Sequence, residues 1–181
     1  NYCSIMHADG AGTKSSLAYI YYKETGDASV FRGIAQDSAV MNTDDLICVG
    51  AVNNYVFSNT IGRNAHRIDN KILSEIIAGY EDFKNKLKKL GIKMVMAGGE
   101  TADLGDLVQT VIVDSTIYVR LQKRNVIDCS KIRLGDSIVA LASFGQASYE
   151  NQFNSGISSN GFTAARHALL NKMYAKKYPE S

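Results

Sequence analysis

The sequence contains 181 residues, 45% of them hydrophobic, and carries a formal net charge of +2. A chain of this length can bury a core as one large domain, or as one domain with part of another. Its apolar runs are too short to span a membrane, its start lacks the pattern of a signal peptide, and its charge is too small to indicate nucleic-acid binding. We therefore expect a cytoplasmic protein with no membrane and no nucleic-acid partner. Its three cysteines lie far apart without metal-ligand spacing, which favours reduced thiols.

The first part of the chain shows alternating strand and helix patterns. Residues 2–8 are predicted to form a short buried strand that ends at Asp9, and residues 17–22 to form a second strand. Apolar positions at helical spacing predict a helix over residues 28–49, and residues 53–58 are predicted as another strand.

A second helix and two further strands follow. Asp69 is predicted as the N-cap of a helix that runs to Leu90 and stops at Gly91. Residues 92–97 have the pattern of a buried strand, and the β-branched stretch 108–121 is predicted as a long strand.

The rest of the chain reads as the start of another unit. The polar residues 122–125 indicate a boundary, after which we expect a strand over 137–142 and a helix over 161–174. The whole pattern predicts a mixed α/β fold without internal repeats. The chain begins without a methionine and ends directly after a helical pattern, so we expect it to be part of a longer protein.

The segment that follows the first predicted strand has the composition of a phosphate-binding loop. Gly10 and Gly12 permit backbone angles that side chains forbid and allow an anion to approach the amides, while Lys14 offers a point charge to phosphate oxygens. Asp9 beside such a loop implies a bridging cation. A glycine-rich hairpin explains the same residues, because Asp-Gly is a common turn pair, and this segment alone leaves both interpretations open.

Two other acidic residues join Asp9 as candidate metal ligands. On a helical wheel Asp45 falls inside the apolar arc, so we expect it to face inward, where a carboxylate needs a cation, an ion pair or hydrogen bonds. Glu100 follows Gly98 and Gly99 at the end of a predicted strand. Mg²⁺ usually takes a few carboxylates together with nucleotide phosphates, which Asp9, Asp45 and Glu100 would suit.

Four motifs in order resemble one family, aminoimidazole ribonucleotide synthetase, the phosphoribosylformylglycinamidine cyclo-ligase of purine synthesis. The segment 8–14 resembles its Asp-Gly-x-Gly-Thr-Lys signature, and 43–46 with the following Gly-Ala resembles its Asn-Asp-Leu helix. Residues 98–102 resemble its Gly-Gly-Glu-Thr-Ala, and residues 159–162 its Ser-Asn-Gly-Tyr helix start. Related ATP-binding enzymes, such as selenophosphate synthetase and thiamine-monophosphate kinase, lack the first and third motifs together.

The resemblance implies ATP-dependent closure of the imidazole ring of formylglycinamidine ribonucleotide, with release of ADP and phosphate. It implies a catalytic set of Asp9, Lys14, Asp45 and Glu100, of which Asp9, Asp45 and Glu100 would hold Mg²⁺ or its water shell. The ATP contacts would be Asp9, Gly10, Gly12, Thr13, Lys14, Gly98, Gly99 and Thr101. Ser159, Asn160 and Gly161, at a helix start, would bind the substrate phosphate, although the same residues are also ordinary N-cap formers.

The family architecture would place an ATP-binding and dimerisation domain at residues 1–124 and the first part of an incomplete C-terminal domain at 125–181. The first domain would hold a mixed sheet with helices on one side, and its strands would join those of a second subunit in a barrel. The implied partners are a small ribonucleotide substrate and a second copy of the chain.

Three departures from the family pattern leave alternatives open. Asp44 stands where the family has Asn, the loop 144–157 is longer than usual, and Ile157-Ser158 replaces a Pro-His pair. The Asp44 and Ile157-Ser158 changes favour a nucleotide-binding relative without catalysis, and a small-molecule kinase of the same fold is the third candidate. The histidines are expected at surface or packing positions: His7, His66 and His167.

Overall fold

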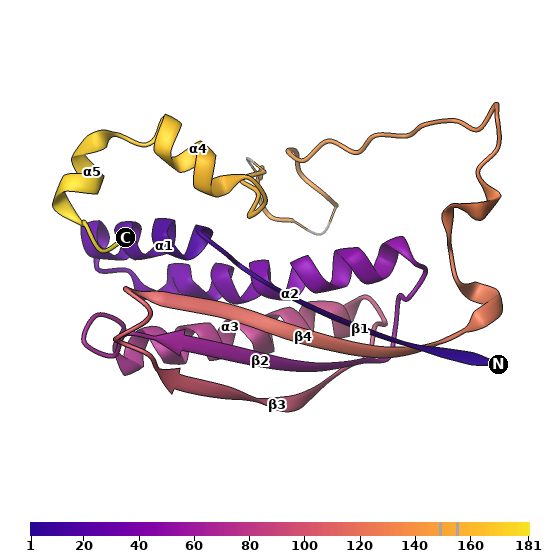
Figure 1. The fold of residues 1–181 in the computed structure, drawn as a ribbon, viewed down its shortest axis with the longest axis horizontal. Coiled ribbons are helices and arrows are strands. Elements are labelled where there is room, and N and C mark those ends of the chain that lie inside the picture. Colours follow the sequence, from indigo (N-terminus) through magenta and orange to yellow (C-terminus); the bar gives the residue numbers. More distant parts are fainter. Residues whose placement is uncertain (149, 155) are drawn as a thin grey trace.

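The computed structural model of the chain describes residues 1–148, 150–154 and 156–181. It has a four-stranded mixed sheet with a helical layer on one face (Figure 1). The strands are β1 (Tyr2–Gly10), β2 (Tyr55–Arg63), β3 (Met94–Asp103) and β4 (Val111–Gln122). The helices are α1 (Lys14–Thr25), α2 (Phe31–Cys48), α3 (Asn70–Lys89), α4 (Phe162–Leu169) and α5 (Lys172–Lys177), with short 3-10 turns at Ala28–Val30, Lys123–Asn125 and Cys129–Lys131.

The sheet order is β1-β4-β2-β3, so β1 and β3 are its two edges. β4 pairs antiparallel with both β1 and β2, whereas β2 and β3 are parallel. The register aligns rows of residues across all four strands. One row contains Asp9, Ser115, Asn59 and Gly99, and the next contains Gly10, Asp114, Thr60 and Glu100.

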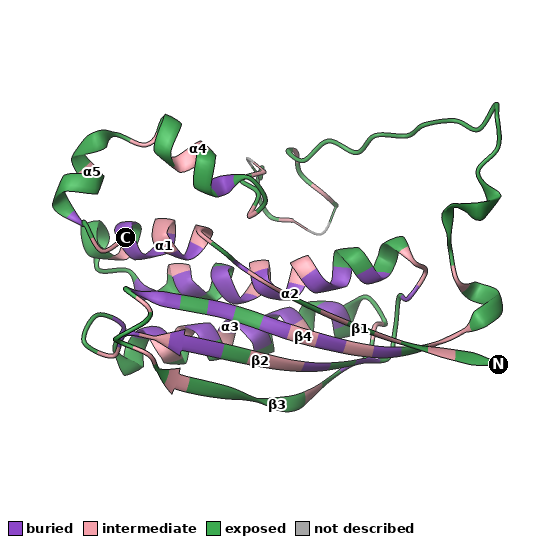
Figure 2. Cartoon of the chain, in the orientation of Figure 1, coloured by how far each residue is buried: buried purple, intermediate pink, exposed green. Residues whose placement is uncertain are grey.

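The two faces of the sheet differ in burial, as Figure 2 shows by the alternation along β4. Val113, Ser115 and Ile117 of β4 are buried against α2 and α3, and the residues between them face outward. The outward face is only partly polar, because Met6, Val56 and Val95 lie in one exposed row across it.

The segment 17–22, expected as a strand, is part of α1, so that prediction is wrong. The buried positions are Ser15, Ala18, Tyr19 and Ile20, and the spacing of three and four residues from Ser15 to Ala18 and Tyr19 is that of a helix face rather than of a strand. Gly26 ends the helix in the left-handed conformation with a φ of 75°. The aromatic residues that favoured a strand are accommodated by packing, which overrides their intrinsic preference.

The expected helix 28–49 is present as a 3-10 turn followed by α2. The boundaries of α3 are confirmed: the Asp69 side chain accepts a hydrogen bond from the Ile72 amide at 2.9 Å, and the left-handed Gly91 follows the last turn. The other four predicted strands are confirmed as β1 to β4. β2 extends to Arg63 and β3 to Asp103, so Glu100 lies inside β3 and not at the end of a strand, where it was expected.

The C-terminal part differs more from expectation. Residues 137–142 form no strand in the described part of the chain, and their apolar side chains are exposed. The helix expected over 161–174 is divided into α4 and α5, because Asn171 caps a new helix by accepting a hydrogen bond from the Met173 amide. Two residues of the long loop, 149 and 155, lie outside the described residues.

The C-terminal segment returns to α1, beside which α4 and α5 lie (Figure 1). Lys177 pairs with Glu24 at 2.7 Å, and the Tyr19 hydroxyl donates to Glu180 at 2.7 Å. Among the described helices, none is both long and apolar enough to cross a bilayer.

Candidate functional site

The glycine loop connects the edge strand β1 to the start of α1. Gly12 has a φ of 57°, a left-handed conformation that favours glycine, and a Cβ at Gly10 would overlap the carboxylate of Asp114. The backbone is anchored to the sheet because the Ala11 amide donates to the carbonyl of Val113 at 3.0 Å. The loop therefore enters the helix at Lys14 with a fixed path.

Next to this loop lies a group of possible metal ligands formed by His7, Asp9 and Asp45. His7 and Asp9 alternate on β1 and so share the face toward α2, which contributes Asp45. The Nε2 atom of His7 lies 2.8 Å from Oδ2 of Asp45, and one ligand atom from each residue lies within 4.8 Å of the others.

A buried amide of α2 holds this group in place. The Nδ2 atom of Asn42 donates to the carbonyls of Asp9, Ser38 and Ser115 at 3.1 to 3.2 Å, and its Oδ1 lies 3.0 Å from Nδ1 of His7. Asn42 is completely buried, so these contacts replace the hydrogen bonds that water would otherwise provide. Neither Asn42 nor His7 is among the expected site residues. The sequence signal for His7 is its position two residues before Asp9 on one strand. The signal for Asn42 is its position three residues before Asp45 on one helix.

The prediction that Asp45 faces inward is wrong, since its side chain is 60% exposed. The face of α2 that packs on the sheet is marked by Ala35, Ala39, Asn42 and Leu46, and Asp45 lies at its rim. The apolar arc on the helical wheel was too wide to separate the buried centre from the rim. Small and polar buried side chains define that centre.

The structure does not bring Glu100 together with Asp9 and Asp45 within one chain. Glu100 shares a row with Asp114, on the outward face, whereas Asp9 shares a row with the buried Ser115. Its strand is the opposite edge, three interstrand spacings of about 4.8 Å from β1. The other residues of that motif lie on β3 with it: Gly98, Gly99 and Thr101.

The structure does bring the start of α4 to the glycine loop. The hydroxyl of Thr13 contacts that of Thr163, and the Lys14 ammonium donates to the carbonyl of Ile157 at 2.8 Å. The residues expected to bind a substrate phosphate, Ser159, Asn160 and Gly161, directly precede α4. A phosphate bound at the glycine loop would therefore lie near the start of α4.

Lys14 is also paired with Asp37 of α2 at 2.9 Å, and both side chains are mostly buried. Burial raises the pKa of Asp37, and the Lys14 ammonium opposes this shift. Asp44 precedes Asp45 in α2. Its pKa is raised first by desolvation and second by the neighbouring Asp45 carboxylate. The site thus combines one enclosed ammonium with several carboxylates.

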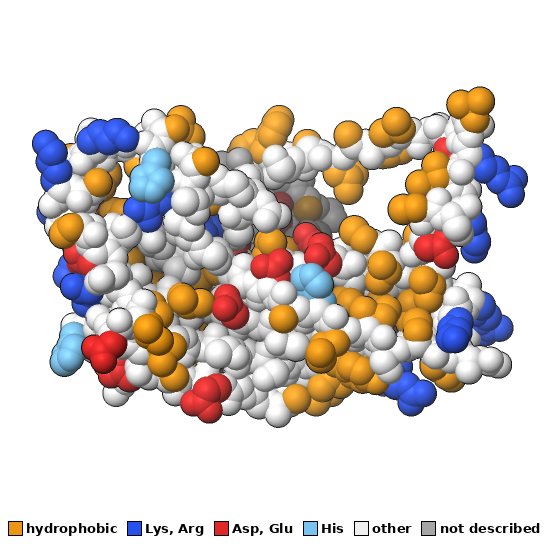
Figure 3. Space-filling view, in the orientation of Figure 1, with side chains coloured by type: hydrophobic (Ala, Val, Ile, Leu, Met, Phe, Trp, Pro, Cys, Tyr) orange, Lys and Arg blue, Asp and Glu red, His pale blue; other side chains and the backbone are white. Residues whose placement is uncertain are grey.

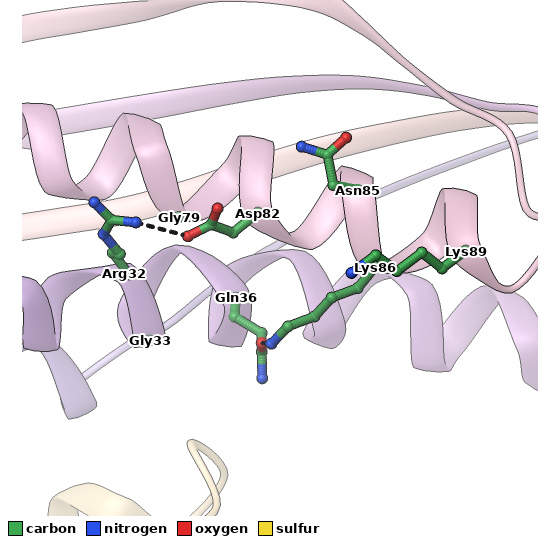
Figure 4. A pocket seen from close by; sticks show the side chains of 8 residues that line it. All are labelled: Arg32, Gly33, Gln36, Gly79, Asp82, Asn85, Lys86 and Lys89. Carbon is green, nitrogen blue, oxygen red and sulfur yellow. Dashed lines mark hydrogen bonds and ion pairs between the residues drawn. The ribbon is translucent and has the colours of Figure 1, made fainter. Parts of the chain in front are cut away.

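A separate groove lies between α2 and α3 (Figure 4). Arg32 pairs there with Asp82 at 3.0 Å, and Lys86 donates to Gln36. None of the expected site residues lines it. Of the other histidines, His66 and His167 are exposed as expected, whereas His7 belongs to the ligand group.

The chain is similar to known proteins along most of its length. Residues 1–118 match the family model described as AIR synthase related protein, N-terminal domain. The phosphoribosylformylglycinamidine cyclo-ligase of Pyrococcus furiosus is 33% identical over 172 residues, which are 95% of this chain and 44% of the relative. The cyclo-ligase of Methanococcus maripaludis is 28% identical over 174 residues, 94% of this chain and 41% of the relative.

The chain thus spans less than half the length of these curated relatives. Among solved structures, T. maritima PurL complexed with ADP is similar with 14% identity and a TM-score of 0.44, over 73% of this chain and 19% of that chain. Because the family model covers most of the chain, including the glycine loop, the ligand group and β3, the chain belongs to the AIR synthase related protein family through its N-terminal domain.

Proposed function

We propose that this chain supplies the nucleotide-binding half of an ATP-dependent cyclo-ligase that converts formylglycinamidine ribonucleotide to aminoimidazole ribonucleotide. The observation that carries the proposal is the convergence of the glycine loop, the enclosed Lys14 and the start of α4. Family membership and the cyclo-ligase names of the relatives support the same reaction. In this reaction the formyl oxygen is phosphorylated by ATP, and an amidine nitrogen then displaces the phosphate to close the ring.

The residues present fit a divalent cation beside the phosphates. Asp9 and Asp45 provide carboxylates within coordination reach of each other, next to the amides of the glycine loop. Lys14 and Thr13 would bind the ATP phosphates, and Ser159, Asn160 and Gly161 the phosphate of the ribonucleotide. Mg²⁺ bound there would neutralise phosphate charge. The chain's own part is to orient the two phosphate-bearing substrates and to exclude water between them.

We further propose that the chain acts as a homodimer. The outward face of the sheet carries an apolar row of Met6, Val56 and Val95, which a second sheet would cover. β1 and β3 are the unpaired edges, so two such sheets joined edge to edge would close a barrel. That closure would place β3 of one copy beside β1 of the other.

A single-turnover experiment separates this proposal from its alternatives. The full-length protein that carries this sequence is mixed with ATP labelled at the γ-phosphate, with and without formylglycinamidine ribonucleotide. A cyclo-ligase releases ADP and free phosphate only when the ribonucleotide is present. A kinase leaves the label on its product.

A nucleotide binder without catalysis is the second candidate, because Lys14 is already held by Asp37 and by the Ile157 carbonyl. It would bind ATP without release of ADP under either condition. That result would contradict the cyclo-ligase assignment, as would a labelled product.

A further inference from the structure

The tautomer of His7 is fixed by the buried amide beside it. Asn42 directs one side-chain atom at three backbone carbonyls, those of Asp9, Ser38 and Ser115, so this atom must be the donating nitrogen. Its oxygen then faces Nδ1 of His7 at 3.0 Å and accepts a hydrogen bond from it. The proton of a neutral His7 therefore resides on Nδ1, and Nε2 carries the lone pair.

That lone pair faces the Asp45 carboxylate. Nε2 lies 2.8 Å from Oδ2 of Asp45, and a ring nitrogen of His7 lies within 4.8 Å of a carboxylate oxygen of Asp9. Two ligand atoms at right angles on a cation with bonds of about 2.1 Å lie about 3 Å apart, which is close to the separation of Nε2 and Oδ2. A metal-bound histidine commonly donates its other ring N–H to a fixed acceptor, the role that Asn42 performs here.

The surroundings favour a cation. Asp44 follows Thr43 on the same turn of α2 as Asp45, and Asp114 lies against Gly10 behind the loop. One oxygen of Asp9 accepts a hydrogen bond from the Gly10 amide at 2.7 Å, which holds its carboxylate toward the group. The set thus combines one imidazole nitrogen with two carboxylates under further negative charge.

We propose that His7 is a metal ligand together with Asp9 and Asp45, and that this nitrogen shifts the site from Mg²⁺ toward borderline transition cations such as Mn²⁺ and Zn²⁺. Mg²⁺ prefers oxygen ligands, whereas imidazole stabilises the transition cations. The inference rests on the proposed function in one respect, namely that the remaining coordination positions face the phosphates of ATP.

The first test measures binding of each metal alone, without nucleotide. Isothermal titration of residues 1–181 with MnCl₂, ZnCl₂ and MgCl₂ is compared for the unaltered chain, His7→Ala and His66→Ala, the last removing an exposed histidine as the matched control. We expect His7→Ala to weaken Mn²⁺ and Zn²⁺ binding at least tenfold and Mg²⁺ binding less than twofold. His66→Ala should leave the affinity for all three metals unchanged. Equal losses for all three metals, or no loss, would overturn the proposal.

The second test detects the coordinating nitrogen directly in the unaltered chain and then assigns it with the same two variants. Pulsed electron paramagnetic resonance of the Mn²⁺-loaded chain should show magnetic coupling to a histidine nitrogen, which disappears in His7→Ala but persists in His66→Ala. Bound Mn²⁺ without nitrogen coupling, or coupling that survives His7→Ala, would contradict coordination by His7.

Both readouts are independent of turnover. A protein that closes the ring with Mg²⁺ but shows no nitrogen coupling would retain the proposed function and lose this inference. A protein that shows nitrogen coupling but releases no ADP would retain this inference and lose the proposed function.

Discussion

At the scale of single residues, Lys14 has both a structural partner and a proposed ligand. Its ammonium is 2.9 Å from Asp37, and the exposed fractions of the two side chains are 19% and 22%. An ion pair this enclosed is costly to break from one side, because the remaining charge stays buried. If Lys14 binds nucleotide as we propose, stability and nucleotide binding depend on the same lysine.

Lys14→Met and the double variant Lys14→Met/Asp37→Asn separate these two roles. We expect the single variant to lower the free energy of unfolding in urea by about 1–3 kcal/mol, since Asp37 loses its partner. The double variant should recover most of that loss. ATP affinity should fall roughly tenfold or more in both variants, because a charge-assisted phosphate contact is missing from each.

Lys23→Met, which removes an exposed lysine from the same helix, is the control and should change neither quantity. Recovery of ATP binding in the double variant would show that Lys14 acts only through Asp37.

At the scale of elements, the sequence identifies those with local signals and misplaces those decided by packing. Asp69 and Gly91 delimit α3 through capping chemistry that is visible in the sequence. By contrast, Tyr19 belongs to a helix because it packs beneath the C-terminal segment, more than 150 residues away in the chain. The same contrast holds in the metal-ligand group. Asp9 can be identified as a candidate ligand from the local sequence, whereas the place of His7 in the group depends on how α2 packs against β1.

The helical layer depends on a close approach of α2 and α3 at Gly79. A Cβ there would overlap the backbone of Arg32, whereas a Cβ at Gly33 has open space around it, and both glycines line the groove in Figure 4. Gly79→Ala should therefore lower the free energy of unfolding by about 1–3 kcal/mol.

Gly33→Ala, inside a helix without that contact, should raise the free energy of unfolding by up to about 1 kcal/mol. Urea denaturation of the two variants gives the comparison. Equal effects would mean that the helices do not approach as closely as the structure shows.

Attachment of the C-terminal segment to α1 should depend on pH. Hydrogen bonds from Lys177 and Tyr178 lower the pKa of Glu24, and one from Tyr19 lowers that of Glu180, both from an ordinary value of 4.5. Because the folded-state pKa values are lowered, the stabilisation is complete above 4.5 and is lost as the pH falls through them.

We therefore expect amide protection in residues 162–181, corrected for intrinsic exchange, to fall between pH 6 and pH 3. Glu24→Gln/Glu180→Gln should show less protection at pH 6 and little further change. A pH response as large as that of the unaltered chain would place its origin in other groups.

At the scale of the whole molecule, the outward face of the sheet is the surface that we propose for a second copy. Its apolar row and the two unpaired edges are the features that a dimer would cover. Figure 3 shows hydrophobic side chains gathered on this face.

Val95→Asp tests the dimer, because a charge in the exposed apolar row would be buried without a partner. Sedimentation velocity should show dimers of the unaltered chain and at least a tenfold weaker association of Val95→Asp. Ile77→Asp, an exposed apolar residue on α3, is the control and should associate normally. An unchanged dimer in Val95→Asp would exclude this face.

The central claim is that the glycine loop and Asp9 support ATP-dependent ring closure. The most direct measurement is the single-turnover rate of ADP release by the full-length protein that carries this sequence, with formylglycinamidine ribonucleotide present, for the unaltered enzyme and for Asp9→Asn. We expect ribonucleotide-dependent release that slows by roughly a hundredfold in Asp9→Asn, since loss of one charged contact to the reacting phosphates costs about 3 kcal/mol. Release at the unaltered rate in Asp9→Asn, or release indifferent to the ribonucleotide, would contradict the account.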